Sequence, residues 1–275
     1  MKPENFNLKD NSLSAQENYI KEHKRHHKLI TSSRIILLIS FLFLWDTSSR
    51  QGWIDSFFFS SPLRVIQCFI KLWTEQNLAM HIGITLSETV ISFLLVFLIS
   101  LLGATALWYS AKLSEISEPY LVLLNSLPKS ALAPLLIVWL GTGFHTIIVA
   151  GISVALFGSI ISFYSGFRQC DPEKITLIYT LGGNRKDAFF KVVLPHSIPT
   201  LLSTTKVNIG LALVGVIIGE FLAARKGLGY LIIYGSQVFQ LDMVITSIFI
   251  LCMISMIFYK SIQTIEHYSR RRCKS

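Results

Sequence analysis

The stretch DPEKITLIYTLGGNRKDAFFKVVLPHSIP, residues 171–199, decides the fold of this chain, because it is a polar, glycine-broken segment between two long apolar runs. Asp171 is predicted to cap a helix that has Pro172 at its first position and Glu173 in its first turn. Gly182-Gly183 then ends this helix. A short helix bounded in this way is too polar to continue either apolar run, so we expect it to form a bend outside them.

A second short helix is predicted directly after the bend. Asn184 can cap it, Asp187 takes the capping-box position, and Leu194-Pro195 closes it after about Val193. The two helices carry more apolar residues than a solvated loop needs, so we expect burial against a partner or against the chain's own apolar runs. These residues are Ile175, Ile178, Leu181, Ala188, Phe189, Val192 and Val193.

Composition places the rest of the chain in a lipid bilayer. Of its 275 residues, 52% are hydrophobic and only 15% are charged, which is too apolar for an ordinary soluble domain. We therefore expect an all-α membrane protein with six transmembrane helices, each needing about 20 predominantly apolar residues. The predicted spans are 29–45, 84–108, 120–140, 146–167, 201–223 and 240–259.

The first of these spans has the least support, because its uncharged apolar run covers only Ile35 to Trp45. A secretory signal peptide is the competing interpretation. A polar tail precedes the run and no small-residue cleavage site follows it, so a transmembrane helix is favoured.

The positions of Lys and Arg predict the orientation of the spans. Five of the 25 basic residues lie in connections on one side of the predicted membrane. Eighteen lie on the other side, in the segments 1–34, 109–119, 168–199 and 260–275. Since cytoplasmic loops carry the excess of basic residues, both termini and the 168–199 loop are expected in the cytoplasm. The 46–80 connection is then external and contains an amphipathic helix from Ser61-Pro62, expected to lie on the outer membrane surface.

The loop also resembles the signature of a known family. Integral-membrane permeases of bacterial ABC importers carry the pattern E-A-A-x3-G-x9-I-x-L-P in this place. This chain has Thr176-Leu177-Ile178, Gly182, Val192, Leu194 and Pro195 at the matching spacing. Further segments, over roughly residues 60–265, resemble the branch that serves nitrate, sulfonate and taurine-type uptake. They are Ser126-Leu127-Pro128, Ala133-Pro134-Leu135, Trp139-Leu140-Gly141, Ile217 to Glu220, and Gly227 to Tyr230.

The chain departs from the family pattern at one point of the loop. The family's acidic-small-small triplet is replaced by Thr176-Leu177-Ile178, so its glutamate is absent. We hypothesise that Glu173, one turn earlier, supplies the missing carboxylate.

The resemblance implies the fold of a type I ABC importer permease with a cytoplasmic coupling-helix loop. It divides the chain into a cytoplasmic tail, a first transmembrane helix with an external amphipathic segment, a core permease domain, and a basic cytoplasmic tail. The corresponding ranges are 1–34, 35–80, 81–265 (with the coupling loop at 168–199) and 266–275.

The implied function is that of the transmembrane subunit of an ATP-driven importer. The solute would be small, such as a sulfonate, nitrate, taurine or a vitamin precursor. The implied partners are an ABC ATPase subunit, an extracellular or periplasmic substrate-binding protein, a second permease copy in a homodimer, and the lipid bilayer. No phosphate-binding GxxxxGK[ST] loop is present, so we expect this chain to bind no cofactor and its partner to use the ATP. The basic clusters lie near span ends, which disfavours nucleic acid as a partner.

Two groups of residues are candidates for function. For docking and movement of the coupling loop, the resemblance implies Glu173, Thr176, Leu177, Ile178, Gly182, Gly183, Val192, Leu194 and Pro195. For the pathway, Pro128 and Pro134 are each expected to break or kink a span and to leave carbonyls that suit a water-filled cavity. Lys129 either attracts an anionic substrate or has a structural partner, and Glu220 either pairs with Arg225, Lys226 or a neighbouring helix or contacts substrate.

Two other classes of protein fit the sequence less well. A stand-alone secondary transporter or channel would show inverted repeats or charged pairs deep in several spans, and neither is evident. A membrane enzyme would carry a motif such as HExxH or GxSxG, and the sequence has none. Four scattered cysteines without metal-ligand spacing indicate no metal site.

Overall fold

The computed structural model describes residues 8–53 and 55–272, and the regular structure in these ranges is helical. The chain divides into two units, Met1–Arg64 and Val65–Ser275. In the first unit, α1 runs without a break from Leu8 to Arg50 and is followed by the short α2 (Ser56–Phe59). The predicted span 29–45 lies within α1. Residues 1–7 and 273–275 of the two predicted tails lie outside the described ranges.

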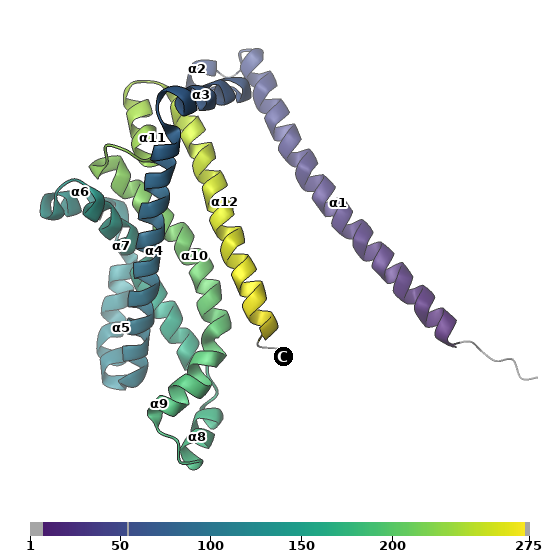
Figure 1. Cartoon of the computed structure of the whole chain (residues 1–275), viewed down its shortest axis with the longest axis vertical. Coiled ribbons are helices and arrows are strands. Elements are labelled where there is room, and N and C mark those ends of the chain that lie inside the picture. Colours follow the sequence, from purple (N-terminus) through teal and green to yellow (C-terminus); the bar gives the residue numbers. More distant parts are fainter. Residues whose placement is uncertain (1–7, 54, 273–275) are drawn as a thin grey trace, which may run out of the picture. The chain divides into compact units, whose positions relative to one another are not determined.

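The second unit contains the helices that can cross a membrane (Figure 1). Four are long and apolar enough. They are α4 (Leu78–Tyr109), α7 (Phe144–Arg168), the continuous helix Arg185–Ala223 that includes α10 (Leu194–Ala223), and α12 (Leu241–Arg272). The pair α5 (Ala111–Ser126) and α6 (Lys129–Leu140) is bent by 95° and makes a fifth if it counts as one span. The chain is therefore an all-helical membrane protein with four or five candidate spans among its described residues.

The broken pair lies in the predicted window 120–140. The helix stops at Ser126 and restarts at Lys129, which confirms that Pro128 interrupts this window. Pro128 has no N–H to donate and disfavours helical backbone in the residue before it. At Pro134 the helix is not broken, because α6 continues through this residue.

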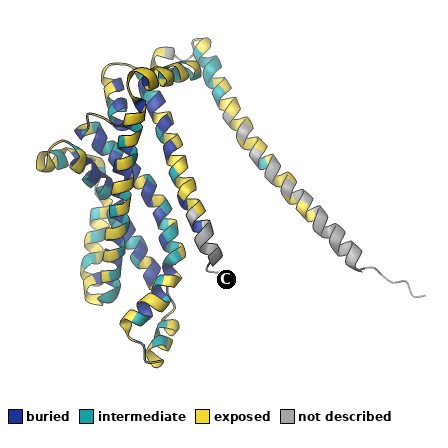
Figure 2. Ribbon diagram, in the orientation of Figure 1, coloured by how far each residue is buried: buried dark blue, intermediate teal, exposed yellow. Residues whose placement is uncertain are grey.

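The core of the second unit is formed by α7, which packs along α4 and α10. Small residues let these helices approach closely: a Cβ added to Gly215 of α10 would lie 2.8 Å from the Cα of Gly151 in α7. Ser92 of α4 donates to the carbonyl of Ile148 at 3.4 Å. Figure 2 shows buried residues on the facing sides of these helices and exposed ones outside, as expected where apolar side chains meet lipid.

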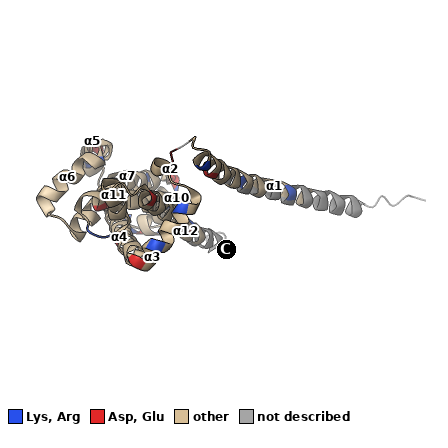
Figure 3. Cartoon of the chain, turned by 90° about the horizontal axis from the view of Figure 1, so that it is seen from above, with Lys and Arg blue, Asp and Glu red and all other residues tan. Residues whose placement is uncertain are grey.

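Charged side chains are sparse along the spans, as Figure 3 shows from above. One exception is the ion pair between Lys206 of α10 and Glu266 of α12, both largely buried. A paired charge avoids the cost of a bare ion in this environment, so the pair helps to hold α12 on α10.

The helix α3 (Pro62–Glu75) begins at Pro62, as predicted. An apolar stripe along it is exposed and follows helical spacing: Leu63, Ile66, Ile70 and Trp73. Leu72 is buried and packs with Leu78, Leu228 and Leu231, where α11 (Leu228–Gln237) begins. An exposed apolar stripe on a helix of this length suits the surface of a bilayer.

The 171–199 segment has the predicted helix caps and the predicted bend at the glycine pair. Asp171 accepts the N–H of Glu173 at 2.9 Å and caps α8 (Pro172–Thr180). Gly182 has a φ of 80°, which favours glycine at the end of the helix. Asn184 and Asp187 form the predicted capping box at the start of α9 (Arg185–Ala188), with both hydrogen bonds at 3.0 Å.

The predicted end of the second helix is wrong. Instead of stopping at Leu194-Pro195, the chain passes from α9 through a π-helical turn, η1 (Phe189–Val193), directly into α10. Pro195 directly follows this turn, where the regular i→i−4 hydrogen-bond pattern is already interrupted, so its missing N–H is tolerated. The second short helix is thus continuous with a span.

Candidate functional site

The outer face of α8 carries exposed apolar side chains. Leu177 and the C-cap residue Leu181, four positions apart, are 57% and 75% exposed; Tyr179, on another side of the helix, is 45% exposed, and Ile175 and Ile178 are half-buried. Exposure of this much apolar surface on a nine-residue capped helix is unfavourable in water. This face therefore has the character of a docking surface.

The apolar side chains at the end of the second loop helix pack against the chain's own spans. Phe189 is only 3% exposed, and its ring centroid lies 5.1 Å from that of Trp108, 5.6 Å from Tyr109 and 5.3 Å from Phe167. We call these four residues the aromatic cluster. Trp108 and Tyr109 end α4 and Phe167 lies in the last turn of α7, so the cluster fastens η1 to both spans.

Arg185 adds a polar contact to this junction. Its guanidinium lies over the rings of Trp108 and Tyr109, at 5.4 and 5.6 Å, and donates to the carbonyl oxygen of Trp108 at 3.1 Å. A cation is favourable at a helix C-terminus and over an aromatic face. Arg185 therefore connects α9 to the end of α4.

Sequence reasoning missed Trp108, Tyr109, Phe167 and Arg185 as members of this site. The available signal was the presence of aromatic residues at the ends of two apolar windows, next to a loop that itself contains Phe189-Phe190. Which of them meet depends on how the helices pack, and that cannot be taken from spacing.

The predicted loop residues occupy three environments. Glu173, Thr176, Leu177 and Pro195 are exposed, and Ile178, Val192 and Leu194 are half-buried. Val192 and Leu194 pack against the aromatic cluster and its neighbours. The glycine pair forms the bend: a Cβ on Gly183 would lie 2.5 Å from the Ile178 side chain.

The pathway candidates are not one cluster. Lys129 donates to the backbone carbonyls of Leu124 and, at 3.2 Å, Asn125, and it lies 5.6 Å from the centroid of the Phe157 ring. Its ammonium group thus satisfies carbonyls left open at the end of α5, which is the structural role weighed against anion binding.

Glu220 lies in a separate, fully buried site. It accepts the Thr85 hydroxyl at 2.7 Å and the N–H of Gly229 at 2.5 Å. These partners come from α4 and from the start of α11. Of the two structural roles predicted for Glu220, the structure therefore shows pairing with neighbouring helices rather than with Arg225 or Lys226. Gly227 is needed here because its φ is 117° and an added Cβ would lie 2.5 Å from the Glu220 carboxyl.

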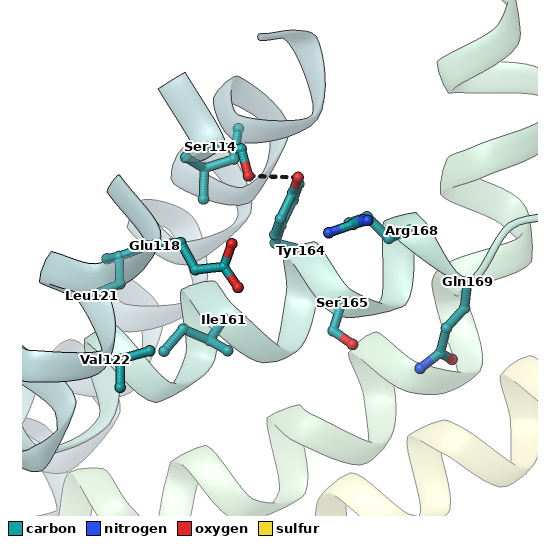
Figure 4. Close-up of a pocket in the computed structure, with 10 residues that line it drawn as sticks. Ser114, Glu118, Leu121, Val122, Ile161, Tyr164, Ser165, Arg168 and Gln169 are labelled. Atoms are coloured by element: carbon teal, nitrogen blue, oxygen red, sulfur yellow. Dashed lines mark hydrogen bonds between the residues drawn. The ribbon is translucent and has the colours of Figure 1, made fainter. Parts of the chain in front are cut away.

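A cavity of about 320 Å³ lies between α5 and α7, beside the loop (Figure 4). Figure 4 shows the carboxyl of Glu118 facing α7 across the cavity, and the Ser114 hydroxyl donates to the Tyr164 oxygen at 2.6 Å. Arg168 also lines it. Among the described residues, no group of His, Cys, Asp or Glu could hold a metal ion.

The geometry defines a class of protein: a helical membrane protein with a broken span and a two-helix loop packed against the ends of its spans. The match to a family model over residues 95–274 is in agreement, and the chain belongs to the family of binding-protein-dependent transport system inner membrane components. It is a multi-pass inner membrane permease subunit of an ABC importer for small solutes, and it is not the ATPase of that importer. This excludes the stand-alone transporter or channel.

Individual relatives agree with the family. A probable ABC transporter permease protein of Haemophilus influenzae is 31% identical over 82% of this chain and 91% of its own length. The formylaminopyrimidine transport permease protein ThiX of Halalkalibacterium halodurans is 23% identical over 89% and 96%. A putative aliphatic sulfonates transport permease protein of Escherichia coli is 25% identical over 84% and 88%.

The fold is also found in solved structures. A bacterial ABC transporter involved in the import of the polysaccharide alginate matches with a TM-score of 0.65 and 13% identity, covering 93% of this chain and 99% of that one.

Proposed function

We propose that the outer face of α8 docks in a groove of the importer's ATPase subunit, and that the aromatic cluster carries the resulting movement into α4 and α7. The exposed row formed by Leu177 and Leu181, four positions apart, is the observation that supports this proposal most strongly. Capping by Asp171 and the bend at Gly182 keep the row presented on an ordered helix.

The nine predicted loop residues have different tasks in this scheme. Leu177 contacts the ATPase, together with Thr176 and the exposed carboxylate of Glu173. Gly182 and Gly183 set the angle between α8 and α9. Val192 and Leu194 belong to the joint with the spans.

The proposal extends to the assembly. Two copies of the chain form a homodimer, and the pathway runs between them, lined by the broken pair α5 and α6 with Pro128, Lys129 and Pro134. The α1 helix supplies the sixth span, and both termini lie in the cytoplasm. This orientation rests on the eighteen basic residues on the loop side.

The proposed cargo is a small organic solute handed over by a binding protein. Permeases named for formylaminopyrimidine and for aliphatic sulfonates are related over more than four fifths of this chain. Both solutes are compact and polar, so a vitamin precursor or a sulfonate is the proposed class.

A cross-linking experiment tests the docking. A Leu181→Cys variant of the permease has its native cysteines replaced by serine. It is expressed with ATPase subunits that each carry one cysteine introduced along the proposed groove, and the complex is treated with a short bismaleimide. We expect a cross-linked pair of the two chains. The control is Leu94→Cys in the same background, because Leu94 is similarly exposed but lies within α4. An intact complex in which position 181 does not cross-link to any ATPase cysteine introduced along its groove would refute the docking.

A further inference from the structure

A pair of buried carboxyl groups connects α4 with α10. Glu88 is 2% exposed and Glu220 is fully buried. Thr85 lies one helical turn before Glu88 on α4 and donates to Glu220 at 2.7 Å, so the two buried carboxyl groups face the same site. Two ionised carboxylates have no hydrogen to place between them, and two like charges in an apolar site repel. The shared site therefore requires one proton.

The surroundings indicate which carboxyl group holds the proton. Glu220 accepts from the Thr85 hydroxyl at 2.7 Å and from the N–H of Gly229 at 2.5 Å. Such a set of donors stabilises an ionised carboxylate. For Oε2 of Glu88, by contrast, the described residues offer no hydrogen-bond partner. A neutral carboxylic acid tolerates this position far better than a carboxylate does.

We infer that Glu88 and Glu220 are a proton-sharing pair, in which Glu88 holds the proton and donates it to Glu220, and that this proton fixes the start of α11 against α4. The bound ligand of this site is the proton itself. The inference concerns the interior of the chain and does not depend on the proposed ATPase docking.

The pair holds the turn before α11 through shared partners. Thr85 donates to Glu220 and accepts the N–H of Leu228 at 2.8 Å, while Nδ1 of His81 lies 3.0 Å from the nitrogen of Gly227. If both carboxyl groups were ionised, their repulsion would act on the group that holds the turn. The proton is thus part of the connection between α11 and the spans.

Other titratable groups face this site and must be separated from it. His81 stacks on the Tyr230 ring with centroids 6.2 Å apart, and Lys226 directly precedes the turn. Neither His81 nor Lys226 is a carboxyl group, so a carboxyl band that responds to Glu88→Gln or Glu220→Gln reports on the pair.

Infrared spectroscopy of the full chain in liposomes tests the inference. Wild type at neutral pH is expected to show the C=O stretch of a buried carboxylic acid. Glu88→Gln should remove this band, because the protonated carboxyl group is gone and Glu220, which keeps its hydrogen-bond donors, stays ionised. Glu220→Gln shifts the band instead, because Glu88 stays protonated beside a neutral amide. Glu118→Gln, at an exposed carboxyl on α5, is the matched control and leaves the band unchanged.

Each other outcome overturns the inference. Absence of the band in wild type shows two carboxylates, and a band lost in Glu220→Gln but kept in Glu88→Gln places the proton on the wrong residue. Wild type alone also suffices should a variant not fold: alkaline titration must convert the band to carboxylate absorption. Uptake by the complete importer should fall over the same pH range in wild type and not in Glu88→Gln, whose amide N–H donates to Glu220 at every pH.

Discussion

Replacing both exposed leucines of α8 by alanine should weaken ATPase binding without unfolding the permease. Leu177 and Leu181 are 57% and 75% exposed, so the chain itself gains little from them. Alanine favours helix at least as well as leucine, and α8 should keep its structure.

The magnitude follows from the surface that docking would bury. A leucine side chain contributes about 1.5–3 kcal/mol when fully buried, and the exposed fractions leave roughly half to three quarters of this for the partner. Since alanine retains part of the contact, we expect a loss of about 2 kcal/mol for the double variant. This corresponds to a dissociation constant raised about 30-fold.

The assay is titration of the isolated ATPase onto the permease in nanodiscs, read by interferometry. Leu94→Ala serves as the control, because Leu94 is 56% exposed and lies midway along α4. A dissociation constant that stays at the wild-type value in the double variant, with the permease folded, would refute the assignment of α8 as the docking helix.

Three further predictions concern the bend, the aromatic cluster and a buried thiol. Gly182→Ala should cost about 1–2 kcal/mol of loop stability, since φ is 80° there, whereas Gly182→Asn should be milder, and ATPase coupling in liposomes should rank the variants in that order. Phe189→Ala should destabilise the permease by about 3–5 kcal/mol by leaving a cavity among three rings, seen as a lower thermal midpoint, while Phe189→Leu loses less. Burial raises the pKa of the Cys170 thiol, so less thiolate is present at neutral pH than for an exposed cysteine. In a protein with the other cysteines removed, maleimide labelling of Cys170 should be slow at neutral pH and should accelerate towards alkaline pH. In the Phe189→Ala variant, labelling should already be fast at neutral pH. Equal labelling rates in the two proteins would contradict the proposal that the aromatic cluster covers Cys170.

The local features of the loop could be predicted from sequence because their partners are close in the chain. The Asp171 cap and the Asn184–Asp187 box join residues two or three positions apart. The end of the second helix could not, because a π-helical turn at 189–193 carries the chain into α10. That turn places Phe189 among rings from α4 and α7, and packing decided its conformation.

The apolar windows determined by themselves that this is a helical membrane protein, since a bilayer requires each spanning backbone to satisfy its own hydrogen bonds. Four windows lie within α4, α7, α10 and α12 to within one residue. The loop pattern, together with the further segments at the family's spacing, likewise indicated the family. Tertiary structure alone decided the 95° angle of the break in the window 120–140, the aromatic cluster at the joint, and the proximity of Glu88 and Glu220, 132 positions apart in the sequence. Such contacts depend on how close small residues let the helices approach, and sequence periodicity does not encode that distance.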